Sequence, residues 1–594
     1  MRHFSIYSKS LCAFAAIGLL GTATATPLGA RSMAHPDDIS RPIGPAVNCG
    51  IFRGYRDRYF RQSMPVNRGA AKSTETGSNI VVTDKNQSSA LPPPSPTGSA
   101  PAEIARGYIG HPQIAPPYPY PYPRLQPRDR ERYDGKEVAS IMRVAEQPVS
   151  TFAVDVDTGS YSNVRRFLNE GRMPPQTAVR TEEMINYFRY DYPKPASREV
   201  PFSVTTDIST TPWNDASRLL RIGLRGYDVN NSERPRANLV FLVDVSGSMG
   251  SRDKLPLVKS TLLGLTNQLR KDDRVSIVVY AGAVGVLLQP TSNKEYIRQA
   301  VECMNSGGGT AGGHALKIAY QTAQANYDSN AINRIIMTTD GDFNVGTSST
   351  NELKEMVAKE RESGVTLTML GYGRGNIRDE LMEGIANVGN GNYAYIDSAM
   401  EAKKVLGDEL SSTLFTIAKD VKIQIEFNPA HVKEYRLIGY ENRLLAEEDF
   451  NNDKVDAGDI GAGHQVTALY EIMPASASGW LPVRRYPANR VVDWQPDFNG
   501  EMANVKLRYK LPNGSKSRLI TRQIAARDLQ KARTPTGDMA FTVAVAAFGQ
   551  KLRGDKYLGE YNFRNINMLS GTGGDYWRQE FRKLSDLASS QTPG

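Results

Sequence analysis

The feature that most constrains the fold is an apolar run that ends abruptly in oxygen-bearing side chains, Asn238-Leu239-Val240-Phe241-Leu242-Val243-Asp244-Val245-Ser246-Gly247-Ser248-Met249. An uninterrupted run of this kind is typical of a parallel strand that is covered on both faces of its sheet. In open α/β sheets, ligands bind at the carboxyl ends of such strands. The sequence therefore predicts a buried strand whose last residues belong to a binding site.

The loop after this strand carries hard oxygen donors. Asp244, Ser246 and Ser248 offer one carboxylate and two hydroxyls, a set that suits Mg²⁺ or Mn²⁺ and suits zinc poorly. Three ligands leave an octahedral cation incomplete. Two further stretches could supply the rest, since Thr310 follows a run of glycines and Asp340 follows another apolar strand. The loop alone would also fit a simple polar turn, but all of these positions together favour a cation site.

This set of residues resembles the metal-ion-dependent adhesion site of von Willebrand factor type A (VWA) domains, complete and in the family's order. The resemblance implies that Ser246, Ser248 and Thr310 coordinate a divalent cation directly or through water. It implies that Asp244 and Asp340 act largely through bound waters. The implied cation is Mg²⁺ or Mn²⁺, with Ca²⁺ as the alternative, and a carboxylate from a protein partner commonly completes its shell.

Helical and strand patterns alternate along the stretch that follows. Strands are predicted at 275–280, 285–288, 334–339, 365–371 and 393–396, and helices at 255–269, 294–304, 315–327, 352–363, 378–387 and 399–417. Alternation of this kind predicts an α/β fold with a doubly wound, mostly parallel, Rossmann-like sheet. We assign residues 237–418 to this domain and call it the VWA domain after the family that it resembles.

The start of the chain has the features of a secretory signal peptide. Basic residues precede an apolar run at 11–20, and Ala23-Thr24-Ala25 offers a small-residue cleavage site. We therefore expect residues 1–25 to direct export to the periplasm or cell envelope, with an uncleaved membrane anchor as the alternative. Residues 26–148 are rich in proline, serine, glycine and arginine and lack a sustained apolar period, which predicts a disordered linker.

Two regions flank the VWA domain. Residues 149–236 are predicted to form an α+β accessory segment, and residues 419–588 a β-rich accessory domain, because polar and apolar residues alternate at several places in the latter. Asn186-Tyr187-Phe188-Arg189-Tyr190-Asp191-Tyr192-Pro193 and Tyr435-Arg436-Leu437-Ile438-Gly439-Tyr440-Glu441-Asn442-Arg443 are similar to the bacterial YfbK-type proteins. The resemblance covers 149–588 and implies an exported protein, but it does not indicate the function of that protein.

Asp155-x-Asp157-x-Gly159 has the opening of a calcium loop. It fails as an EF-hand, because the glycine comes one place early and Arg166 stands where the closing acid belongs. We predict a structural turn at this position.

The net charge of the chain indicates which partners it could bind, and its cysteines indicate the redox compartment in which it folds. The formal net charge is +9, but arginine-rich pieces such as 53–61 and 124–132 lie outside the predicted core. In an exported protein they suit envelope or membrane surfaces better than nucleic acid, so we expect no nucleic-acid partner. Cys49 and Cys303 could pair in an oxidising compartment, but nothing in the sequence fixes them close together. We expect no disulfide framework.

No catalytic constellation stands out in the sequence. Ser246 or Ser248 could be imagined with His314, but no Gly-x-Ser-x-Gly elbow surrounds either serine, so we expect no enzyme and place His314 at the rim of the site. The features favour a divalent-cation-dependent protein-binding module that captures an acidic side chain of a partner. Two alternatives stay open: a structural envelope protein that the metal only stabilises, and a metal-dependent hydrolase.

Overall fold

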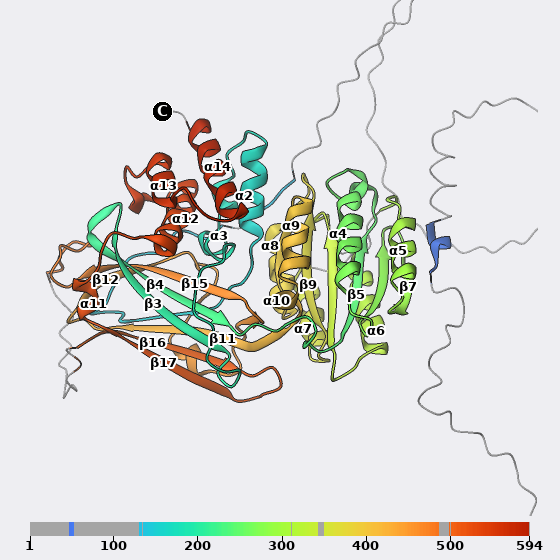
Figure 1. Cartoon of the computed structure of the whole chain (residues 1–594), viewed down its shortest axis with the longest axis horizontal. Helices are drawn as coiled ribbons and strands as arrows, with labels where there is room; N and C mark the ends of the chain where they lie inside the picture. Colours follow the sequence, from blue (N-terminus) through green and yellow to red (C-terminus); the bar gives the residue numbers. More distant parts are fainter. Residues whose placement is uncertain are drawn as a thin grey trace, which may run out of the picture. The chain divides into compact units, whose positions relative to one another are not determined.

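Three β-sheets organise the folded chain (Figure 1). The computed structural model describes residues 47–52, 130–133, 135–309, 312–342, 350–485, 498 and 500–592. The predicted signal peptide and most of the predicted linker lie outside these ranges.

The first sheet is the one that carries the candidate site. Its strands lie in the order β10-β9-β8-β5-β6-β7, and β7 alone among them runs antiparallel to its neighbour. Their bounds are β5 Ala237–Asp244, β6 Arg274–Tyr280, β7 Val284–Thr291, β8 Ile332–Thr339, β9 Thr366–Tyr372 and β10 Tyr393–Ile396. The strand order reverses between β5 and β8, and such a switch point is where open α/β sheets bind ligands.

Helices cover both faces of this sheet. The helices on one face are α4 Leu255–Gln268, α5 Lys294–Cys303, α9 Ala399–Lys403 and α10 Leu410–Leu414, and those on the other are α6 Gly312–Ala325, α7 Thr350–Arg361 and α8 Asp379–Val388. Successive side chains of the fully buried β5 alternate between the two cores, with Phe241 in the first and Leu242 in the second. The predicted doubly wound α/β class is confirmed.

The helix predicted at 399–417 is interrupted. After α9 the chain forms a π-helical turn at Lys404–Asp408, then the short α10, and Thr416 already begins strand β11, Thr416–Phe427. Gly407 lies within this π-helical turn, and glycine has low helix propensity. Ile417 instead packs in the core between the other two sheets.

These two sheets are antiparallel and face each other as a sandwich (Figure 1). The first has the order β1-β12-β15-β4-β3, with bounds β1 Met142–Arg143, β12 Val432–Ile438, β15 Gln465–Pro474, β4 Asn214–Gly226 and β3 Phe202–Thr211. The second has the order β13-β2-β11-β16-β17, with bounds β13 Leu444–Leu445, β2 Val149–Ala153, β16 Glu501–Lys510 and β17 Ser517–Ala525. Their inner faces share one hydrophobic core.

Both regions that flank the VWA domain contribute strands to each sandwich sheet. Strand β2 pairs with β11, and β4 pairs with β15, so strands that precede the VWA domain lie beside strands that follow it. Strand β1, which lies within the predicted linker, pairs with β12. The VWA domain is thus inserted between two halves of one sandwich.

A helical layer covers the outer face of the first sandwich sheet (Figure 1). It consists of α2 Gly159–Asn169, α3 Thr181–Asn186, α12 Gly537–Arg553, α13 Phe563–Ser570 and α14 Tyr576–Gln591. Leu219 and Leu469 of the sheet share its core with Phe541 and Phe581 of the helices. This layer also combines elements from before and after the VWA domain.

Cys49 and Cys303 form a disulfide bond with their Cα atoms 5.9 Å apart, contrary to the expectation from sequence. Residues 47–52 lie along β7, where a 2.8 Å hydrogen bond from the Asn48 amide to the Leu287 carbonyl holds them. Phe52 enters the core of the VWA domain. The two cysteines meet because this short segment, far away in sequence, pairs with the edge strand beside α5.

Two arginines join α8 of the VWA domain to the rest of the fold. Arg443 pairs with Asp155 at 3.2 Å, with Asp157 at 3.1 Å and with Glu383 of α8 at 3.5 Å. The Asp157 amide also donates to the Asp155 carboxylate at 2.9 Å, so this segment is a turn held by an arginine. Arg180 similarly bridges α3 and α8 through Glu183 and Asp379.

One acid beside this network predicts a pH dependence of stability. Glu182 of α3 is 1% exposed, and its Oε2 atom has no hydrogen-bond partner among the described residues. Burial, together with the charges of Glu441 and Asp155, raises the pKa of Glu182 to about 7. Because this folded-state pKa lies above the unfolded value, the folded state loses stability as the pH rises between the two values, and the loss is complete above pH 7.

We therefore expect Glu182→Gln to raise the free energy of unfolding at pH 8 by on the order of 2–3 kcal/mol, and to change it little near pH 4. Urea unfolding at both pH values measures the difference. Glu380→Gln, at an exposed position of α8, is the matched control. Equal pH dependence in the unmodified chain and Glu182→Gln would contradict the prediction.

Candidate metal centre

Asp244 is the last residue of β5 and is fully buried. One carboxylate oxygen accepts a 2.9 Å hydrogen bond from the Ser246 amide, and the other accepts a 3.2 Å bond from the Thr339 hydroxyl. Among the described residues, no lysine, arginine or histidine forms an ion pair with it. Burial raises the pKa of Asp244 to about 7, and the negative charge of Asp340 adds to this effect.

The serine loop borders the glycine loop that precedes Thr310. Ser246 and Ser248 place their Oγ atoms 3.0 Å apart. The Gly307 amide donates to the Val245 carbonyl at 2.8 Å, and the Gly247 amide donates to the Gly308 carbonyl at 3.0 Å. Thr310 itself lies outside the described residues, so its predicted ligand role stays a prediction.

Asp340 follows β8 directly and is also fully buried. Its Oδ1 atom accepts a 3.0 Å hydrogen bond from the Asp342 amide. Its Oδ2 atom accepts from the Lys254 ammonium at 2.8 Å and from the Asn376 amide group at 3.3 Å. No sequence motif marks Lys254 or Asn376. Their places, before α4 and after β9, lie at the end of the sheet where ligand-binding loops gather, and that is the signal that could have suggested them.

The donor set fits a divalent cation. Two buried carboxylates face only one ammonium, and Asp244 has only neutral hydrogen-bond donors beside it. A buried carboxylate without a cationic partner is costly, and a bound cation relieves that cost. Hydroxyls and carboxylates are the oxygen ligands that Mg²⁺ and Mn²⁺ prefer. The geometry therefore agrees with the predicted use of Asp244, Ser246, Ser248 and Asp340, without testing it.

A second acidic group lies elsewhere in the fold. Carboxylate oxygens of Asp155, Glu183 and Glu383 lie within 4.8 Å of one another, and all three residues are buried. Arg180 and Arg443 already contact these carboxylates. The arginine charges compensate the acids, which makes this group a structural network rather than the better cation site.

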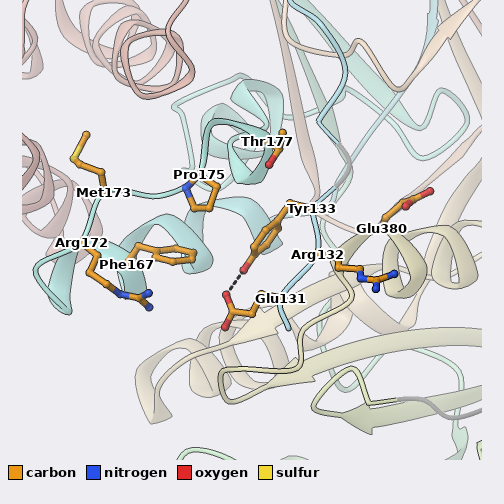
Figure 2. A pocket seen from close by; sticks show the side chains of 9 residues that line it. All are labelled: Glu131, Arg132, Tyr133, Phe167, Arg172, Met173, Pro175, Thr177 and Glu380. Atoms are coloured by element: carbon orange, nitrogen blue, oxygen red, sulfur yellow. Dashed lines mark hydrogen bonds between the residues drawn. The ribbon is translucent and has the colours of Figure 1, made fainter. Parts of the chain in front are cut away.

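A cavity of about 610 Å³ lies beside the 131–133 segment and the turn that follows α2 (Figure 2). It is lined by Glu131, Arg132, Tyr133, Phe167, Arg172, Met173, Pro175, Thr177 and Glu380. The Tyr133 hydroxyl donates to Glu131 at 2.8 Å, and Glu131 also pairs with Arg166 at 2.9 Å. The lining residues include no serine, cysteine or histidine. The residues that line the cavity therefore form no serine–histidine or cysteine–histidine pair.

The predicted rim residue His314 is exposed on α6. No hydrogen bond between described residues joins it to Ser246 or Ser248. The Oγ atoms of these two serines instead contact each other, so neither serine is paired with His314 among the described residues. Across the same residues, no helix combines the length and the apolar character needed to cross a membrane.

Comparison with known proteins identifies the family. The model of the von Willebrand factor type A domain matches residues 238–408, a model described as von Willebrand factor matches 127–221, and one described as uncharacterized protein YfbK, C-terminal, matches 412–590.

Individual proteins are similar to this chain over different shares of its length. Uncharacterized protein YfbK of Escherichia coli (strain K12) is 44% identical over 474 residues, which are 78% of this chain and 81% of that protein. Inter-alpha-trypsin inhibitor heavy chain H3 of Homo sapiens is 26% identical over 260 residues, 40% of this chain and 28% of that protein. The solved von Willebrand factor type A structure from Catenulispora acidiphila covers 67% of this chain and 91% of its own, with 14% identity and a TM-score of 0.37. The chain belongs to the YfbK-type family of bacterial VWA domain proteins.

Proposed function

We propose that this chain is an exported protein-binding module that captures an acidic group of a partner protein through a bound divalent cation. The observation that carries the proposal is the fully buried Asp244 carboxylate, which has only neutral donors beside two serine hydroxyls. The VWA domain itself is an interaction or adhesion-type module, and that supports the same reading.

The site residues have distinct tasks in this proposal. Ser246, Ser248 and Thr310 would hold the cation, and Asp244 and Asp340 would support it largely through water. Mg²⁺ or Mn²⁺, with Ca²⁺ as the alternative, supplies when bound an electropositive position for a partner carboxylate. Thr339 and the Ser246 amide keep Asp244 in place by their hydrogen bonds.

The disulfide supports export. Disulfide bonds persist in oxidising compartments such as the bacterial periplasm, and the Cys49–Cys303 bond fits that setting. We therefore propose the periplasm or cell envelope as the location, with the basic linker available for an anionic surface. The proposed partner is a protein that presents an acidic side chain, and the proposal involves neither nucleic acid nor catalysis.

Asp244→Asn tests the site directly. We expect it to weaken Mn²⁺ and Mg²⁺ binding by about 10–100-fold in calorimetric titrations, because the amide carries no charge. The same change should leave the metal-free protein at least as stable as before at pH 8, since it removes a buried charge. Asp272→Asn, at an exposed position, is the control and should change neither quantity.

Capture from envelope extract tests the partner. The metal-loaded chain should retain a protein that a chelator releases, and Asp244→Asn should not retain it. If the cation raises the unfolding temperature but association is unchanged by chelator, the structural envelope protein replaces the binding module as the better interpretation. If neither form binds a cation, the proposed metal site is wrong.

A further inference from the structure

Lys254 brings a fixed positive charge into the candidate metal centre. Its ammonium group lies 2.8 Å from Asp340 Oδ2, and the two side chains are 7% and 0% exposed. This is the one buried ion pair that the described residues make with the predicted ligands. An ion pair removed from water in this way holds its geometry far better than one on the surface.

The fold provides a specific slot for this lysine. Gly373, after β9, has a φ of +67°, and a Cβ built there would lie 2.2 to 2.8 Å from the carbons of the Lys254 side chain. The Tyr395 hydroxyl donates to the Gly373 carbonyl at 2.8 Å and so fixes the wall of the slot. The lysine stem therefore occupies space that only glycine leaves open. Its ammonium group lies at the end of this slot, in contact with Asp340.

Both oxygens of Asp340 are already engaged by the protein. Oδ1 accepts from the Asp342 amide, and Oδ2 accepts from Lys254 and Asn376. A carboxylate held in this way can still act on a cation through an intervening water, as the proposed function requires of it. The lysine can therefore stay in place when a cation binds.

We propose that Lys254 is a permanent counter-ion of the metal centre, which makes the cation-loaded site net positive and so selects an anionic group from the partner. When both aspartates are ionised they carry two negative charges, and Lys254 cancels one of them. A divalent cation then leaves one positive charge in a buried setting, and one partner carboxylate neutralises it. This inference rests on the proposed function.

The charge balance predicts opposite effects on two affinities. Without Lys254, the site attracts a divalent cation more strongly, but the loaded site is neutral and attracts a carboxylate less. We expect Lys254→Met to raise Mn²⁺ affinity by about tenfold or more, and to weaken acetate binding to the Mn²⁺-loaded chain by about tenfold. Methionine is neutral and has a side chain of similar length, so it keeps the slot filled. The loss of charge is then the main change.

The experiment uses the full chain. Calorimetry measures Mn²⁺ affinity, and line broadening of ¹³C-acetate by bound Mn²⁺ measures carboxylate binding. Lys359→Met, at an exposed position of α7, removes the same charge from the same domain and should change each affinity less than about twofold. Equal or weaker Mn²⁺ binding by Lys254→Met than by the unmodified chain would overturn the inference, whereas no Mn²⁺ binding by either form would overturn the proposed function as well.

A measurement on the unmodified chain covers the case in which Lys254→Met does not fold. Acetic anhydride labelling followed by mass spectrometry should find Lys254 protected both without Mn²⁺ and with saturating Mn²⁺, while Lys359 reacts in both. Labelling of Lys254 that appears only after Mn²⁺ is added would show that the ammonium leaves Asp340, and the inference would then be wrong.

Discussion

Arg165→Met is expected to lower the free energy of unfolding by about 3–5 kcal/mol, because it leaves buried carboxylates without their cation. Arg165 of α2 is 3% exposed. Its guanidinium contacts Asp397 at 2.5 Å, Glu401 of α9 at 2.7 Å and Glu580 of α14 at 3.0 Å. Glu401 is fully buried, so its charge cannot turn to water when the arginine is lost.

The same change should loosen the VWA domain from the helical layer. Arg165 connects α2 and α14 of that layer with α9 of the VWA domain. Denaturant unfolding gives the free energy, and hydrogen exchange of α9 reports local opening. Arg198→Met, which breaks the exposed pair with Glu233, is the control and should leave the unfolding midpoint unchanged. A loss as small for Arg165→Met as for the control would show that the network does not hold the domains together.

Replacing both Cys49 and Cys303 by alanine is expected to lower the free energy of unfolding by about 2–5 kcal/mol. The bond links residues 254 positions apart, so it restricts the unfolded chain strongly. The bond also tethers the 47–52 segment next to β7. We expect faster hydrogen exchange at the Asn48 amide, whose bond to Leu287 would no longer be supported.

Reductant provides the matched comparison. The unmodified chain in reductant should unfold like the double variant, and the double variant should not respond to reductant. Peptide mapping of the unreduced chain should recover Cys49 and Cys303 in one linked peptide. Separate, alkylated Cys49 and Cys303 peptides from protein purified out of an oxidising compartment would contradict the disulfide and remove its support for export.

The sequence was most informative where local pattern and burial agree. The run 239–243 is apolar at every position because β5 is covered on both faces, so its strand character and its place in the middle of a parallel sheet could be predicted. Asp244 ends β5 and Asp340 follows the adjacent β8, and the carboxyl ends of adjacent parallel strands meet at one edge of the sheet. The fold class and the proximity of these two acids to the serine loop therefore follow from local patterns.

The sandwich could not be assembled from pattern alone. Alternation predicted that several segments form strands, but β2 pairs with β11 and β4 with β15 across the whole inserted VWA domain. Such pairing depends on which faces find complementary partners after the chain collapses, and alternation carries no record of the partner. The early end of the helix predicted at 399–417 has the same cause, because Ile417 packs in the sandwich core as part of β11.

By itself, the sequence determined the buried strands, the oxygen donors at their ends and the kind of cation that such donors suit. Only the tertiary structure decided which side chains meet. It pairs Lys254 with Asp340 and Arg165 with Glu401, and it joins Cys49 to Cys303. The physical reason is the distance along the chain over which each feature depends on other residues. Hydrophobic periodicity reflects a residue's own exposure, whereas an ion pair or a disulfide needs two side chains from distant segments within a few ångströms, and only the packed chain brings them there.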